Sequence, residues 1–127
     1  MTLKMYEITD FPSFYNKVKS QQLPFKTSYR LAMLVQEIEK HIGYYQEQFR
    51  ELLTAYGKKD ENGNLIPTSD GQGVMLAEET LNEAYTKLAE LRNLDVTLPD
   101  TKFSENDFNG IELSPEEMIV ILPFIGE

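Results

Sequence analysis

The feature of this sequence that most constrains its fold is a row of apolar residues that recurs at alternating spacings of four and three between positions 31 and 56. Such a heptad row predicts one long α-helix with a single apolar side. Thr27 or Ser28 can cap its N-terminus, and Gly57 can end it in a left-handed conformation. Gly43, in the middle of the helix, points to a close crossing of another backbone. The row consists of Leu31, Val35, Ile38, Ile42, Tyr45, Phe49, Leu52 and Tyr56.

A second and shorter row of the same spacing lies between positions 77 and 91. Two successive helices with one apolar row each predict an antiparallel helical hairpin, over about residues 27–57 and 76–93. The second helix is about half as long as the first, so part of the longer row needs another cover. A short N-terminal helix in DFPSFYNKVKSQ, capped by Asp10, could supply it. The second row consists of Ala77, Leu81, Ala84, Leu88 and Leu91.

The connection between these helices is rich in Asp, Asn and Gly. Its start resembles a calcium-binding loop, but counting from Asp60 the sixth position is Leu65 instead of Gly and the twelfth is Gly71 instead of Glu, which excludes that motif. The turn-forming stretches ENGN and SDGQG instead predict two short extended arms, 65–67 and 74–76. We therefore expect a small β-hairpin at the tip of the helical hairpin and no metal site.

The periodicity changes after residue 93. LDVTLP, residues 94–99, alternates between apolar and polar residues, as in a half-buried strand. TLKMYEI near the start of the chain and GIEL at 110–113 are candidate strands that could pair with it. We therefore predict a minor sheet.

A short apolar helix is predicted at the C-terminal end. Ser114 is suited to the N-cap, Pro115 to the first helical position, and Glu117 completes a capping box. We expect this helix to be buried against the helical hairpin. The whole sequence thus predicts a single domain, residues 1–127, with a mainly helical α+β fold.

The charge of the chain is uneven. The net charge is −9, and from residue 94 onward eight acidic residues against one lysine give −7. Residues 1–30 hold five basic and two acidic residues, a net charge of +3. An acidic end repels nucleic acid and favours a basic protein partner, although the acids could also serve only solubility.

The composition argues against several kinds of site. The chain has no cysteine, which excludes disulfides and thiolate chemistry. No apolar run approaches the roughly 18 residues that span a bilayer, so we expect a soluble protein without a membrane partner. His41 is the single histidine, no serine has a nucleophile-elbow motif, and DGQG lacks the lysine of a phosphate-binding loop. We therefore expect no enzyme activity, no catalytic residues and no cofactor.

Three stretches of the sequence carry a resemblance to known proteins: LPFKTSYRLAMLVQEIEK, LLTAYGKKDENGNLI and ELSPEEMIVILPFI. With the small hairpin and second helix between them, they resemble a family of small phage and prophage proteins of unknown function, over most of residues 23–125. The resemblance implies a phage origin and a non-enzymatic role, in virion assembly or in handling a host factor. It implies no catalytic residues.

The expected function is therefore that of a phage structural or assembly protein that binds a phage structural protein or itself. It would work in the host cytoplasm during infection or in the virion, with the basic start of one copy against the acidic end of another. The alternative is an acidic inhibitor of a host nucleic-acid enzyme or defence system, whose carboxylates imitate DNA phosphates. The residues expected to contact a partner are Tyr44, Asp70, Asp100, Glu105 and Asp107.

Overall fold

The computed structural model describes residues 1–126 and has one long helix, α3 (Phe25–Tyr56), that contributes to two separate packing units. The first unit contains residues 1–42 and the chain from Asp95 onward, and the second contains Gly43–Leu94. The mainly helical α+β fold predicted from the sequence is confirmed. The single domain stays a prediction. Although α3 is 32 residues long, no described helix carries an apolar stretch that could cross a bilayer.

The predicted long helix is confirmed, but it begins at Phe25, so Thr27 and Ser28 lie within it and do not cap it. The two halves of its apolar row differ in burial. Within the first unit α3 buries Leu31, Val35, Ile38 and Ile42, as the heptad row predicts. It also buries Leu34, so the apolar side is wider there than a strict heptad row. In the second unit the members of the row are only half-buried: Tyr45, Phe49, Leu52 and Tyr56.

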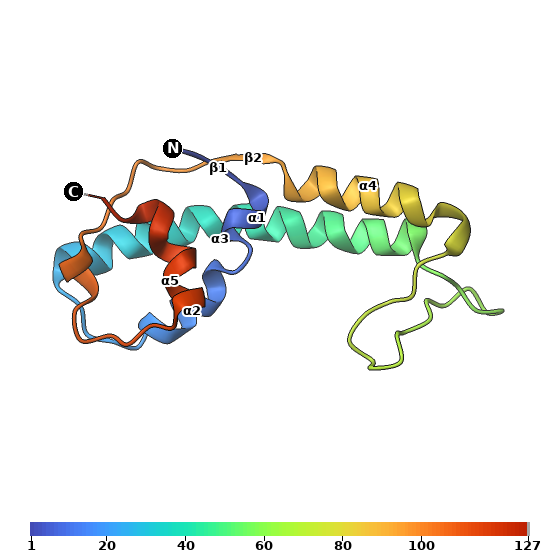
Figure 1. Cartoon of the computed structure of the whole chain (residues 1–127), viewed down its shortest axis with the longest axis horizontal. Coiled ribbons are helices and arrows are strands. Elements are labelled where there is room, and N and C mark those ends of the chain that lie inside the picture. Colours follow the sequence, from blue (N-terminus) through green and yellow to red (C-terminus); the bar gives the residue numbers. More distant parts are fainter. Residues whose placement is uncertain (127) are drawn as a thin grey trace. The chain divides into compact units, whose positions relative to one another are not determined.

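The minor sheet of the first unit has two strands. β1 (Thr2–Lys4) lies beside β2 (Asp95–Thr97) in Figure 1 and pairs with it in antiparallel orientation. In this register Leu3 is opposite the buried Val96. The prediction that residues 2–8 form one strand is wrong beyond Lys4. A short helix, α1 (Met5–Ile8), begins there because Met5 and Ile8 are both buried, which helical spacing allows and strand alternation does not.

The strand predicted at 110–113 is also wrong. These residues form no strand and follow a short 3₁₀ helix, η2 (Glu105–Phe108). Gly110 has a φ of +87°, a left-handed conformation that turns the chain and interrupts an extended run.

The core of the first unit is aromatic and lies between helix α2 (Phe11–Val18), η2, helix α5 (Pro115–Ile121) and the 3₁₀ helix η3 (Leu122–Phe124). The predicted N-terminal helix is confirmed as α2, although Asp10 makes no side-chain capping bond. Edge-to-face contacts join Phe11 to Phe124 at 5.8 Å and Phe14 to Phe108 at 5.6 Å between ring centroids. Such aromatic pairs add about 1 kcal/mol each beyond the area they bury.

The C-terminal helix begins as predicted but packs differently. The Ser114 hydroxyl accepts a hydrogen bond from the Glu117 amide at 3.2 Å, and the Glu117 carboxylate accepts one from the Ser114 amide at 3.0 Å. We expected this helix against the helical hairpin, but it packs on α2, where Lys17 pairs with Glu117 at 2.9 Å. Because only one side of α5 faces α2, several of its apolar residues stay exposed: Met118, Ile119 and Leu122 of the adjoining η3.

The second unit contains the helical hairpin. Helix α4 (Leu81–Arg92) runs antiparallel beside the C-terminal part of α3 (Figure 1), burying Ala84 and Leu91. The Tyr56 hydroxyl donates to Glu83 at 2.9 Å across the pair. The predicted start of the second helix at 76 is wrong. Ala77 is extended because its amide bonds the Tyr56 carbonyl, and a 3₁₀ turn, η1 (Glu78–Thr80), precedes α4.

The connection between α3 and α4 is built from three extended stretches instead of two. The predicted arms do pair, through an antiparallel bridge between Pro67 and Val74. A third stretch, residues 57–60, joins them in a closed ring of three backbone hydrogen bonds: Lys58 N–H to Met75 O at 2.7 Å, Met75 N–H to Ile66 O at 2.8 Å, and Ile66 N–H to Lys58 O at 3.0 Å. This connection, residues 57–77, is called the finger below.

Gly43, within α3, and Gly57, directly after its last residue, do not have the roles predicted for them. Gly57 is not left-handed, since the described positive-φ glycines are Gly63, Gly71 and Gly110. It is buried, and a Cβ there would collide with the Leu53 carbonyl oxygen and lie 2.5 Å from Leu65 Cδ2, so the end of α3 and the finger together leave no room for a side chain. At Gly43, by contrast, a Cβ would meet nothing within 4 Å. The predicted close crossing at Gly43 is therefore wrong.

Candidate protein-contact site

The five residues predicted to contact a partner do not form one surface. Tyr44 and Asp70 belong to the second unit, whereas Asp100, Glu105 and Asp107 belong to the first. Several of the carboxylates have partners within the protein, which the sequence did not indicate.

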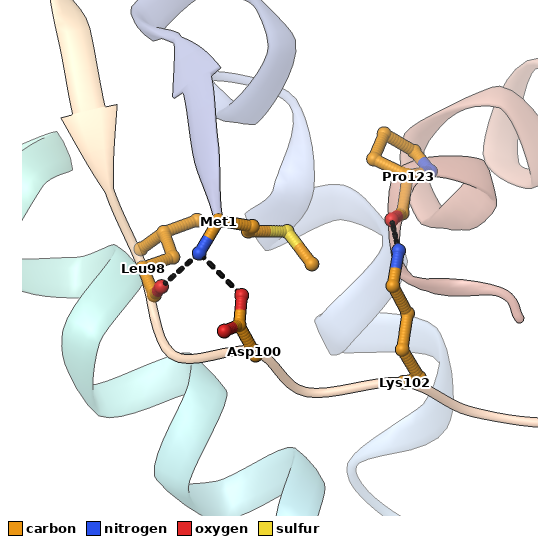
Figure 2. A network of polar contacts seen from close by, with 5 residues as sticks. All are labelled: Met1, Leu98, Asp100, Lys102 and Pro123. Atoms are coloured by element: carbon orange, nitrogen blue, oxygen red, sulfur yellow. Dashed lines mark hydrogen bonds and ion pairs between the residues drawn. The ribbon is translucent and has the colours of Figure 1, made fainter.

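Asp100 is held by the N-terminal ammonium group (Figure 2). The Met1 ammonium donates to Asp100 Oδ1 at 2.6 Å and to the Leu98 carbonyl at 2.9 Å. This hydrogen bond, reinforced by the positive charge, lowers the pKa of the Asp100 carboxyl. Nearby, Lys102 Nζ donates to the Pro123 carbonyl at 2.9 Å (Figure 2). The Asp100 side chain is 87% exposed, so its bond with the N-terminus is a surface ion pair.

Asp107 is a structural residue of η2. One of its oxygens accepts a hydrogen bond from the Ser104 amide at 2.8 Å, and the other accepts one from the buried Thr27 hydroxyl at 3.1 Å. The carboxylate thus caps η2 and attaches it to the first turn of α3. Glu105, two residues earlier, is exposed and borders a groove described below.

Asp70 stabilises a turn of the finger. Its carboxylate accepts hydrogen bonds from the Thr68 hydroxyl and, at 3.1 Å, from the Gln72 amide. The hydroxyl bond first, and the amide bond second, lower the pKa of the Asp70 carboxyl. Gly71, the next residue, is left-handed, so Asp70 and Gly71 together form the turn, and the Asp70 carboxylate has a structural role there.

Tyr44 lies at a recessed surface of the second unit. It is half exposed and borders a groove of about 360 Å³ between α3 and α4 in the second unit. The walls carry charges of both signs and a few apolar side chains: Tyr44, Gln48, Glu51, Leu52, Tyr56, Lys87, Glu90, Leu91 and Leu94.

The most exposed apolar surface was missed in the sequence and lies on the first turns of α3. Phe25, Tyr29 and Met33 follow one another at spacings of four, so they share one side of the helix. Their exposures are 83%, 59% and 47%, high for side chains of this size. The rings of Phe25 and Tyr29 stack, with centroids 6.2 Å apart. We call these three residues the α3 stripe.

The α3 stripe lies on the side of the helix away from the core. Thr27 and Leu31 are buried, and each is two positions from a stripe residue, which corresponds to about 200° around the helix axis. Two exposed cations, Lys26 and Arg30, flank the stripe, and neither forms an ion pair with another described residue.

A second surface that the sequence did not reveal is a groove beside α5. It has a volume of about 470 Å³ and lies between the 105–113 segment and the α5–η3 segment. Its apolar character comes from the exposed Met118 and Leu122 and from half-buried residues of the loop. We call it the α5 groove, and its lining residues are Glu105, Phe108, Asn109, Gly110, Ile111, Leu113, Met118, Ile121, Leu122 and Ile125.

One of these surfaces had a signal in the sequence. The spacing of Phe25, Tyr29 and Met33 is as regular as that of the buried row, which lies on the opposite side of the same helix. A helix with apolar residues on two opposite sides needs two partners. The α5 groove had no such signal, because its walls come from segments whose approach depends on tertiary packing.

Within residues 1–126, no group of three or more His, Asp or Glu side chains is placed to hold a metal ion. Neither protein-family models nor curated proteins nor solved structures give a significant match to this chain. The phage origin stays a prediction.

Proposed function

We propose that this is a phage protein that acts without catalysis, through protein–protein contact in virion assembly. The phage origin comes from the sequence resemblance described above. The observation that carries the contact function is the α3 stripe, an exposed apolar row on the side of α3 opposite the buried row.

The composition of the α3 stripe and its flanks is that of an interface centre. Phe, Tyr, Met and Arg are enriched in protein interfaces, and aromatic and arginine side chains supply most binding energy there. Complete burial of a Phe side chain is worth about 2 kcal/mol, so two rings and a methionine in one row are a substantial anchor.

The stacked pair also favours binding over a purely structural role. Phe25 and Tyr29 already restrain each other in the free protein, with ring planes 20° from parallel. A partner therefore has less side-chain entropy to remove when it covers them. Neither ring contributes to the buried core of the first unit.

The alternative, an acidic inhibitor that imitates DNA, has weaker support. That function requires carboxylates that are free to meet a basic channel. Asp100 is paired with the N-terminal ammonium, and Asp107 is occupied by Ser104 and Thr27. Asp100 and Glu105 are both exposed, but of the three only Glu105 makes no hydrogen bond or ion pair with another described residue.

The proposed function can be tested in cells that produce the phage. A Phe25→Ser/Tyr29→Ser variant should fold and accumulate but fail to enter assembling particles, or should stop their assembly. Tyr85→Ser is a matched control, because Tyr85 is 56% exposed, close to the 59% of Tyr29. Normal particles that contain the double variant at the wild-type copy number would overturn the proposal.

A further inference from the structure

We propose that the α3 stripe of one copy docks into the α5 groove of a second copy. This inference deepens the proposed function and rests on it, because it names the first partner of the stripe as the protein itself. It is carried by the match between two surfaces of the first unit in size, polarity and charge.

The α5 groove is suited to an apolar row. Met118 and Leu122 are exposed along its α5–η3 side, and Ile111 and Leu113 are half-buried along the other. Its volume of about 470 Å³ lies within the range of about 300–1,000 Å³ that encloses a compact organic ligand. It can therefore receive ring side chains such as those of Phe25 and Tyr29. A helix laid in an apolar groove is a recurrent mode of recognition.

The charges around the two surfaces have opposite signs. Lys26 and Arg30 flank the stripe, and the sequence from Phe25 to Gln36 contains no acidic residue. Glu105 lines the groove, and Glu112 is exposed between two of its lining residues. Opposite charges at the rim of an apolar contact guide its formation and its register.

The stripe cannot fill the groove of its own unit. The Thr27 hydroxyl bonds Asp107 in η2, which turns the Thr27 side of α3 toward the segment that forms one wall of the groove. Phe25 and Tyr29 are two positions on either side of Thr27 and lie about 200° around the helix from it. They therefore point away from that wall, and a contact between stripe and groove must join two copies.

A contact between two different surfaces of the same chain has a defined consequence. It leaves a free stripe at one end and a free groove at the other, unless the copies close into a ring or a reciprocal dimer. Self-association should therefore depend on both surfaces and on salt, because the rim charges are exposed.

The test uses two variants and their mixture in sedimentation velocity. The stripe variant is Phe25→Ser/Tyr29→Ser, and the groove variant is Met118→Lys/Leu122→Lys, in which both changed residues are exposed. Circular dichroism and thermal melting establish that each folds. Ile119→Lys is the matched control for the groove, because Ile119 is exposed on α5 but does not line the groove.

We expect the wild type and Ile119→Lys to self-associate. Each double variant alone should self-associate at least about tenfold more weakly, because loss of an interface anchor typically lowers affinity by this much. An equimolar mixture should form a one-to-one complex, since it still contains one intact stripe and one intact groove.

A wild type that associates while the mixture stays monomeric would overturn the pairing of stripe with groove. A wild type that is monomeric at all concentrations would overturn self-docking. Neither result bears on whether the stripe is needed for particle entry, so failure of this inference is distinguishable from failure of the proposed function.

Discussion

The rings of Phe25 and Tyr29 stack on the outer side of α3 with centroids 6.2 Å apart, although 83% and 59% of these residues remain exposed to solvent. Solvent-exposed aromatic pairs on one helix side are typical of contact surfaces, because the exposed area is recovered only when a partner covers it. The same helix buries its opposite side in the first unit. α3 therefore has both a structural side and a contact side.

The two halves of the buried row should respond differently to a buried charge. Ile38→Asp places a carboxylate where the native side chain is 1% exposed, and should cost several kcal/mol of unfolding free energy, about 3 or more. Leu52→Asp should cost clearly less, because Leu52 is half-buried and its carboxylate can reach water. Urea unfolding of both variants measures the difference. Equal losses would contradict the division of the row into a buried and a half-buried part.

Two glycines of the helical hairpin offer a matched pair. Gly57→Ala should destabilise the second unit by about 1–3 kcal/mol, because its Cβ would press on Leu65 and on the Leu53 carbonyl. Gly43→Ala should stabilise the helix by about 1 kcal/mol, because its Cβ meets open space. Thermal melting of the two variants should shift in opposite directions. A stabilised Gly57→Ala would show that the finger does not pack on the helix end.

The pairing of Glu117 with Lys17 should appear in the pH dependence of stability. The Lys17 hydrogen bond, with help from Ser114, lowers the pKa of the Glu117 carboxyl in the folded protein. Its contribution is therefore complete above the ordinary glutamate pKa of about 4.3 and is lost as the pH falls through the lower folded-state pKa.

The corresponding experiment compares the wild type with Glu117→Gln by urea unfolding at several pH values. The stability difference should be largest near neutral pH and should shrink in the acid range. Glu116→Gln, a change at the neighbouring exposed position, is the control and should show little difference at any pH. A wild-type advantage that persists unchanged in acid would rule out the ion pair as its source.

The acidic segment 100–107 should be less tolerant of substitution than its sequence indicates. Asp107→Ala removes a cap and the partner of the buried Thr27, and should cost about 1 kcal/mol. Glu105→Gln should leave the unfolding free energy within about 0.5 kcal/mol, because the residue is exposed. Thermal melting of both variants separates the two roles. If neither variant changes the melting temperature, the segment is only a charged surface.

The parts of the fold that could be predicted from the sequence are those set by local chemistry. The heptad row specified α3. The capping box of Ser114 and Glu117, together with Pro115, specified the start of α5, because the two hydrogen bonds of the box join residues three positions apart. The alternation around Val96 specified β2 in the same way.

The parts that could not be predicted depend on contacts between distant residues. Met5–Ile8 is too short for its periodicity to separate helix from strand, and burial of Met5 and Ile8 decides in favour of a helix. The lack of room for a side chain at Gly57 comes from the Leu53 carbonyl and from Leu65 and Val74 of the finger. The pairing of Asp100 with the N-terminus and of Asp107 with Thr27 was likewise invisible, because these partners lie 99 and 80 residues away, whereas the bond between Asp107 and Ser104 spans only three positions.

The most direct test of a contact function for the α3 stripe is photo-cross-linking from position 29 in cells that produce the phage. Benzoylphenylalanine replaces Tyr29 in one sample and, as the control, Tyr85 in another, two positions of nearly equal exposure. The account predicts a covalent adduct from position 29 with a virion protein or with a second copy of the chain, and little or none from position 85. Equal yields from both positions, or adducts from position 29 with a host nucleic-acid enzyme alone, would contradict it.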